Sequence, residues 1–201
     1  MLKLGVVGLS SGNGHPYSWS AICNGYNSSE MEKTGFPNIA TYLGQRCWPA
    51  CILNSADVDW VWCPNYEDSK SISGAANIDN IAGSLSELIE NCDGILLARD
   101  DVGGRRSILL EVLDSGKFVF VDKPLSHSRE ESEYLFSLQK IDCQIFTCSS
   151  LVYSNDICLT KEEQESLGEI MKISAVTPKK WKLYSPHIID PIINFLDIKK
   201  R

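Results

Sequence analysis

Three absences narrow the classes of protein to which this chain of 201 residues can belong. The sequence holds no apolar run long enough to cross a bilayer, and its first residues lack the apolar core and cleavage site of a signal peptide. It also has no basic stripe: the net charge is −7, with the acidic excess in residues 1–154. Such a charge pattern does not attract nucleic acid. The sequence therefore predicts a cytoplasmic protein that binds neither a membrane nor nucleic acid.

A metal or disulfide framework is also missing, although the chain has eight cysteines. Cys47 and Cys51 are the one pair whose spacing suggests a metal, and neither a second pair nor a nearby histidine accompanies them. A structural zinc site needs four ligands at defined spacing. In the cytoplasm unpaired cysteines stay reduced. We therefore expect free thiols and no metal ion.

Strand-like and helix-like runs alternate along most of the chain. Repeated strand–helix units predict a parallel sheet with right-handed crossovers. The expected fold is α/β, a Rossmann-like doubly wound parallel sheet in a first domain of residues 1–150. The strands are expected at residues 2–8, 58–63, 94–98, 118–121 and 144–148, and helices follow Pro16, Ser69, Ser84, Arg106 and Ser128.

Two segments depart from this alternation. Residues 28–57 are long for a connection and rich in turn residues, so we interpret them as an insertion that packs on the domain surface. After residue 150 the composition changes: residues 168–176 resemble a turn into a strand, and residues 188–196 an apolar helix. One strand and one or two helices cannot enclose a core. Residues 151–201 are therefore expected to be the start of an incomplete second α/β domain.

The loop after the first expected strand has the composition of a phosphate-binding turn. Glycines let a backbone approach phosphates, and the following helix offers N–H donors and a favourable dipole. The G-x-G-x-x-G spacing is missing, so short polar side chains would have to take over some positions. A strand-to-helix turn without a ligand is the alternative, and the loop alone does not decide. The candidate dinucleotide-binding residues are Gly8, Ser10, Ser11, Gly12, Asn13 and Gly14.

Polar residues also follow the second and third expected strands, at the edge where open α/β sheets bind ligands. Asn65 stands where an acid usually holds the cofactor ribose, and its amide would tolerate a 2′-phosphate, so NAD and NADP both remain open. An ordinary turn is the alternative there. Arg99 and Asp100 form either a surface ion pair or part of a cofactor cleft. Their place at a strand end favours the cleft.

The fourth expected strand runs directly into Asp122-Lys123-Pro124. Proline has a fixed φ and biases the residue before it towards an extended conformation. Lys123 is thereby placed at the ligand-binding edge of the sheet. A surface lysine that ends a strand is the alternative, but the motifs around it favour a role towards both cofactor and substrate.

Two residues near the C-terminus could move a proton. His187 and Asp190 are three residues apart near the start of a predicted helix, so they share a face. Histidine is the natural proton shuttle near neutral pH, and a carboxylate one turn away can orient it or raise its pKa. We expect the other two histidines, His15 and His127, to be structural.

Together these motifs resemble the glucose–fructose oxidoreductase/inositol dehydrogenase (Gfo/Idh/MocA) family. Residues 114–124 are similar to the family's aGKhVlvEKP signature, with Asp122 in place of Glu. Residues 168–170 look like the start of its second domain, and Tyr184-x-x-His187-x-x-Asp190 resembles its active-site helix.

The resemblance implies NAD or NADP as cofactor and hydride transfer at a sugar- or polyol-like hydroxyl or carbonyl. Lys123 would hydrogen-bond the reacting oxygen, His187 would relay the proton, and Asp190 would position the substrate or the histidine. Two residues depart from the family pattern: Leu183 replaces an aspartate, and Arg105 replaces a histidine.

The chain is also much shorter than members of that family, so we expect its substrate-binding sheet to be incomplete. An NAD(P)-dependent oxidoreductase is the leading interpretation. Two alternatives are a non-catalytic dinucleotide-binding remnant of the family and a subunit that a partner chain completes. A homo-oligomer is a further arrangement in which the second domain could be completed.

Overall fold

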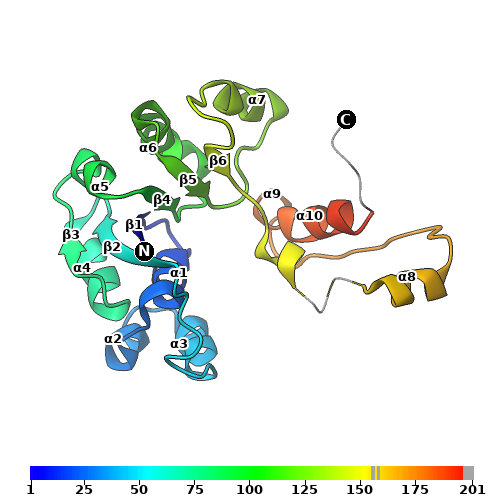
Figure 1. Cartoon of the computed structure of the whole chain (residues 1–201), viewed down its shortest axis with the longest axis horizontal. Helices are drawn as coiled ribbons and strands as arrows, with labels where there is room; N and C mark the ends of the chain where they lie inside the picture. Colours follow the sequence, from blue (N-terminus) through cyan, green and yellow to red (C-terminus); the bar gives the residue numbers. More distant parts are fainter. Residues whose placement is uncertain (155–156, 158, 197–201) are drawn as a thin grey trace.

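Six parallel strands form one sheet in the order β3-β2-β1-β4-β5-β6 (Figure 1). The computed structural model describes residues 1–154, 157 and 159–196. The strands are β1 Leu2–Val7, β2 Ala56–Trp62, β3 Asn80–Ile81, β4 Gly94–Leu97, β5 Phe118–Val121 and β6 Ile145–Phe146. This topology is that of a doubly wound Rossmann-like fold. The predicted fold class is confirmed.

A hydrophobic core lies on each face of the sheet, because successive strand residues point to opposite faces. Val6 belongs to the core under α1 His15–Asn24 and α4 Tyr66–Ala75. Val7 belongs to the core under α5 Leu85–Asn91, α6 Val102–Ser115 and α7 Arg129–Ser137. The continuous apolar run of β4 follows from cover on both faces, whereas Phe118 of β5 is exposed.

Local capping signals set several helix ends. Ser84 and Ser128 accept the N–H groups of Glu87 and Glu131 and so begin α5 and α7. At Ser84 the capping is one-sided, because the Glu87 carboxylate accepts the N–H of Gly83 and not that of Ser84. Helix α6 begins at Val102 and α4 at Tyr66, earlier than predicted in both cases.

The predicted insertion forms two short helices that add side chains to one of the cores. Residues 28–57 contain α2 Ser28–Glu32 and α3 Pro37–Gly44, and their residues Met31 and Leu43 are fully buried beside α1 and α4. Each short helix packs against the domain through one large apolar side chain that is aimed inward. The end of the insertion was placed too late, since Ala56 already belongs to β2.

Residues 150–196, the C-terminal arm, extend to one side of the sheet (Figure 1). The arm contains the 3₁₀ turn η1 Ser150–Tyr153, α8 Lys161–Leu167, α9 Trp181–Tyr184 and α10 Pro186–Phe195. The strand predicted at residues 168–176 is not formed. A strand needs a neighbour for its backbone hydrogen bonds, and the described residues offer none there. A second domain from residue 151 therefore stays a prediction, and residues 197–201 lie outside the described part.

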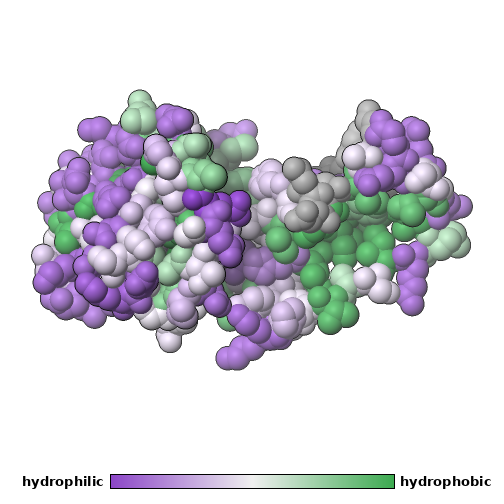
Figure 2. All heavy atoms as spheres, turned by 90° about the horizontal axis from the view of Figure 1, so that it is seen from below, coloured by the Kyte–Doolittle hydropathy of each residue, from purple (hydrophilic) through white to green (hydrophobic). Residues whose placement is uncertain are grey.

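Hydrophobic residues gather on the arm, whereas the sheet-bearing part seen in the same view is mostly hydrophilic (Figure 2). An apolar hollow of about 280 Å³ on the arm is lined by Ile157, Leu159, Ile173, Pro191, Ile192 and Phe195. In the described part of the chain no helix is both long and apolar enough to span a membrane.

Candidate active site

The carboxyl ends of three adjacent strands bring the predicted site segments together. Val7 of β1 pairs with Leu97 of β4, which pairs with Val121 of β5. The loop 8–14, residues 98–101 and residues 122–125 consequently leave the sheet side by side. This is the edge at which doubly wound folds bind ligands.

Asp122 is the hub of this edge. Its Oδ2 accepts hydrogen bonds from Asn13 Nδ2 at 2.7 Å and from His15 Nδ1 at 2.6 Å, and the residue is only 1% exposed. Lys123 Nζ lies 3.8 Å from the other carboxylate oxygen. Burial alone would raise the pKa of Asp122, but His15, Lys123 and Asn13 hold this pKa below its usual range. The carboxylate therefore stays charged and ties the loop to Lys123.

We predict that Asp122→Asn weakens folding and changes its acid dependence. Because the folded pKa of Asp122 is depressed, its stabilisation is present above the unfolded value of about 3.9 and is lost as pH falls through the folded value. The variant should lose about 2 kcal/mol of unfolding free energy at neutral pH, and less as the pH falls. Urea denaturation at pH values down to about 3 measures this, with the exposed Asp79→Asn as control. An equal pH dependence in wild type and Asp122→Asn would contradict the assignment.

The loop itself combines tight packing with an exposed tip. A Cβ on Gly14 would lie 2.4 Å from the Ile39 side chain, and a Cβ on Gly8 would lie 2.6 Å from Pro16. Gly12 has a φ of 78°, and nothing lies within 4 Å of a Cβ placed there. Ser11 and Gly12 are exposed. The backbone at the tip is thus open to a ligand, while the loop ends are fixed against the helices.

Two of the three polar side chains of the loop already have partners within the protein. Buried Ser10 donates to Asp100 Oδ1 at 2.7 Å, and Asn13, also buried, donates to Asp122. Asn13 Oδ1 also accepts the N–H of His15 at 2.9 Å. Of the predicted loop donors, Ser11 alone keeps an exposed hydroxyl.

The residues after β4 line a cleft, whereas the residue after β2 caps a helix. Arg99 binds Asp101 through both Nε and Nη2, at 2.9 and 2.7 Å, rather than its neighbour Asp100. Both acids line the cleft between the sheet edge and the arm. Asn65 acts as the N-cap of α4 and accepts the N–H of Glu67 at 3.2 Å. This capping role explains the position of the Asn65 side chain without any ligand.

The arm carries the predicted proton-transfer pair to this edge. Lys123 Nζ lies 5.7 Å from the centre of the Tyr184 ring, which is 5.6 Å from the His187 ring. Buried Ser149 links the pair: its Oγ is 2.8 Å from His187 Nδ1, and its N–H donates to Asp190 Oδ2 at 2.8 Å. Burial lowers the pKa of His187, and the charges of Lys123 and His15 lower it further. The imidazole is neutral at physiological pH.

A cleft of about 650 Å³ separates the sheet edge from the arm. Ser10, Ser11, Asp100, Asp101, Val102 and His127 line it on one side, and Lys180, Trp181, Lys182 and Leu183 line it on the other. Its volume is within the range of small-molecule sites. In the described residues no cluster of histidine, cysteine, aspartate or glutamate could hold a metal ion.

Sequence reasoning missed three contributors to this edge. His15 was expected to be structural, and its contacts are of that kind, but its partners were not predicted: it binds Asp122 and stacks on Trp19 with ring centres 5.0 Å apart. Ser149 was not expected to link the proton-transfer residues. Arg105 was noted only as a departure from a family pattern. Of the three, only Ser149 stands beside a predicted strand end, whereas His15 and Arg105 directly precede predicted helices and nothing in the sequence indicated their partners.

Arg105 is only 1% exposed. Its guanidinium donates to the carbonyls of Asp122 at 2.6 Å and Leu125 at 3.0 Å, and also to those of Arg99 and Pro124. Burial lowers the pKa of Arg105 to about 10, so the group remains charged at neutral pH. One side chain therefore fixes both segments that leave β4 and β5.

Comparison with known proteins first gives the class of fold. The chain superimposes on an NAD-binding protein from Listeria innocua with a TM-score of 0.55, at 13% identity over 83% of this chain. That likeness establishes a Rossmann-like α/β fold.

Individual relatives are oxidoreductases by name. The myo-inositol dehydrogenase of Lactobacillus casei, solved with NAD(H) and myo-inositol, has a TM-score of 0.49 and 16% identity over 78% of this chain. YceM of Salmonella typhimurium, named as an oxidoreductase, is 26% identical over 98 residues, or 48% of this chain. No family model matches the chain.

The chain spans only part of each relative's length. It covers 31% of YceM, 41% of the Listeria protein and 39% of the inositol dehydrogenase.

Proposed function

We propose that the chain binds a nicotinamide dinucleotide, NAD or NADP, and supports reversible hydride transfer at a hydroxyl-bearing carbon of a sugar- or polyol-like substrate. The observation that carries this proposal is the convergence of Lys123 with Tyr184 and His187 at the ligand-binding edge of a Rossmann-like sheet. The resemblance of the sequence motifs to the Gfo/Idh/MocA family supplies the substrate class.

The fit of the dinucleotide rests on the loop tip and the cleft. The exposed backbone of Ser11 and Gly12 offers an approach for a pyrophosphate, and the adjoining cleft has room for part of a dinucleotide. Ser10 and Asn13 would then act by holding the loop in shape through Asp100 and Asp122. They are therefore not proposed as direct phosphate donors. Asn65 stays a candidate ribose contact through its exposed amide.

When bound, the nicotinamide ring would take up or give the hydride. Lys123 would then hold the reacting oxygen, since an ammonium group stabilises an alkoxide or polarises a carbonyl. The residue is 8% exposed, so water screens its charge only weakly. Asp122 beside it fixes its position without removing its charge.

His187 would move the proton through its Nε2. Ser149 Oγ accepts the N–H of Leu151 at 3.3 Å and has a second lone pair for an N–H at His187 Nδ1, which lies 2.8 Å away. In this tautomer Nε2 carries no proton and can take the proton of a substrate hydroxyl, and the resulting imidazolium returns that proton in the reverse direction. Asp190 accepts the Ser149 N–H and so positions the residue that orients His187.

The proton-transfer role predicts a specific pH profile. In the oxidation direction neutral His187 acts as a base, so kcat/KM should be constant above the usual histidine pKa of about 6.5 and fall only below it, because the folded pKa is lowered. His187→Gln should lower kcat about 10²–10⁴-fold and abolish this acid limb. Rates measured from pH 5 to 8 test this. An unchanged acid limb in the variant would assign it to another group.

The function is tested by turnover of NAD and NADP, followed by absorbance, on a panel of sugars and polyols. Activity on at least one compound supports the proposal. Dinucleotide binding without turnover on the panel would instead favour the non-catalytic binding protein. Turnover that appears only with a partner chain would favour the completed-subunit alternative.

A further inference from the structure

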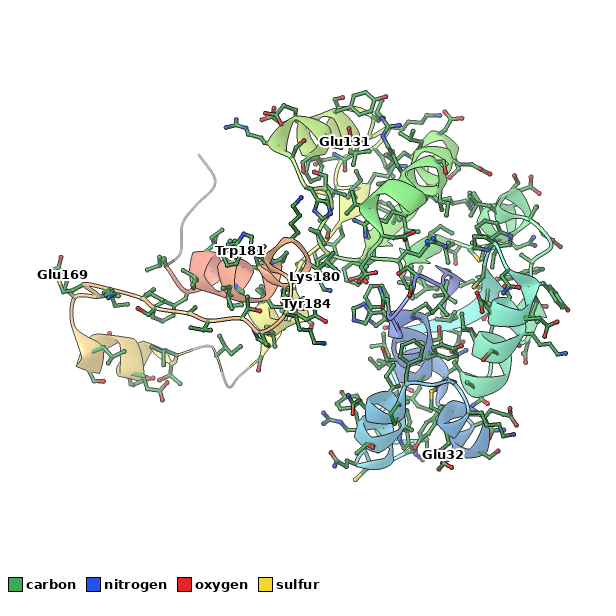
Figure 3. All side chains as sticks on the ribbon, turned by 180° about the vertical axis from the view of Figure 1, so that it is seen from behind. Glu32, Glu131, Glu169, Lys180, Trp181 and Tyr184 are labelled. Atoms are coloured by element: carbon green, nitrogen blue, oxygen red, sulfur yellow. The ribbon has the colours of Figure 1, made fainter. Side chains whose placement is uncertain are left out.

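The two walls of the cleft carry opposite charge. Asp100 and Asp101 line the sheet side, whereas Lys180 and Lys182 line the arm side with Trp181 between them. Figure 3 shows Lys180, Trp181 and Tyr184 at the end of the arm that lies nearest the sheet. The lysines stand out because the chain as a whole carries a charge of −7.

The acidic wall has its own partners. Asp100 accepts the Ser10 hydroxyl at 2.7 Å, and Asp101 is bound by two nitrogens of Arg99. Because these contacts lie within the sheet side, the two carboxylates do not engage the lysines across the cleft. The arm is therefore not held in place by ion pairs with them.

The basic wall has no such partners. Within the described residues, the side chains of Lys180 and Lys182 make no hydrogen bond or ion pair. The adjacent Lys179 differs, since its Nζ lies 2.9 Å from the Tyr184 hydroxyl. Two unpaired ammonium groups facing one cleft supply donors and charge for an anion.

Trp181 adds a planar apolar surface between these charges. Its side chain is 61% exposed, although an indole of this size normally contributes much of its energy by burial. The flat face of an indole stacks well on a base or on the apolar face of a sugar ring. An anion and a ring placed side by side are features of a phosphorylated sugar or a nucleotide.

We propose that Lys180, Trp181 and Lys182 form a binding wall for a phosphorylated ligand. The lysines hold the phosphate, and the indole stacks on the ring next to it. This inference rests on the proposed function, because the wall faces the cleft assigned there to cofactor and substrate. The phosphate belongs either to the dinucleotide or to a phosphorylated sugar substrate.

Calorimetric titration of the full chain separates these sources. The ligands are NADH, NADPH, glucose 6-phosphate and neutral glucose. The test variant is Lys180→Ala/Lys182→Ala, and the matched control is Lys70→Ala/Lys172→Ala, which removes the same charge from exposed lysines outside the cleft. We expect the test variant to bind at least one phosphorylated ligand about tenfold more weakly than wild type, with the control unchanged. Added salt should narrow this difference.

The source of the phosphate follows from which ligand loses affinity. A loss with a dinucleotide alone places the cofactor phosphate on the wall, and a loss with glucose 6-phosphate alone places a substrate phosphate there. The proposed binding wall is contradicted if no phosphorylated ligand binds wild type, or if none binds the test variant more weakly than wild type. It is also contradicted if the control variant loses as much affinity as the test variant, or if the test variant loses as much affinity for glucose as for the phosphorylated ligands. If no dinucleotide binds wild type while glucose 6-phosphate still loses affinity, the proposed function fails and the wall stands.

Discussion

Replacing Lys123 with methionine should lower kcat about 10²–10³-fold, with little change in dinucleotide affinity. Methionine keeps much of the side-chain volume and removes the ammonium group that would bind the reacting oxygen. The fold should survive, because Asp122 keeps its hydrogen bonds to Asn13 and His15. Steady-state rates with calorimetric binding of NADH or NADPH measure the two effects separately.

The control for this change is Lys70→Met, which removes an exposed lysine outside the cleft. Its kcat should equal that of wild type. If Lys123→Met also kept the wild-type rate, Lys123 would have no part in the chemistry. An equal loss in the control would show that net charge, not the position of the ammonium group, is responsible.

Arg105→Ala should destabilise the chain more than any other single substitution at this edge of the sheet. Its guanidinium satisfies the carbonyls of Arg99, Asp122, Pro124 and Leu125 inside the protein. Each buried carbonyl left without a donor costs about 1–3 kcal/mol, so the unfolding free energy should fall by about 3 kcal/mol or more. Urea denaturation followed by circular dichroism measures it.

The adjacent arginine provides a matched control. Arg106 is exposed and pairs with Glu131 at the surface, so Arg106→Ala should change stability little. If Arg105→Ala does not fold, Arg105→Lys serves as the second measurement. Lysine keeps the charge but lacks the planar fork of donors, so the stability of Arg105→Lys should lie between those of wild type and Arg105→Ala. If either Arg105→Lys or Arg105→Ala were as stable as wild type, Arg105 would not have its proposed role.

The sheet could be predicted from the sequence wherever a strand was long and buried. Residues 118–121 form the strand β5 as expected, because an apolar run lies between Gly116 and a charged segment. Strand β3 consists of Asn80 and Ile81 alone, too short to show a periodic pattern. The strand expected at 168–176 has the right residue pattern but no neighbour, and pattern alone does not supply one.

The site could be predicted only as far as its sheet edge. Topology placed the loop 8–14 and Lys123 together, since parallel strands end at one edge. The partners of the polar side chains could not be predicted, because Asn13 and Asp122 are 109 residues apart and His15 and Asp122 are 107 apart. Such contacts depend on how whole elements pack. For the same reason the sequence did not reveal that Ser10 and Asn13 hold the loop in shape through Asp100 and Asp122.

Direct titration of the full chain with NADH and NADPH is the measurement that tests the proposed function most closely. The exposed loop tip at Ser11 and Gly12 and the cleft beside it predict saturable binding of at least one dinucleotide, with one site per chain. Calorimetry with folded protein gives both the affinity and the stoichiometry. The absence of saturable binding by either dinucleotide would contradict the proposal that this sheet edge is a nicotinamide-binding active site.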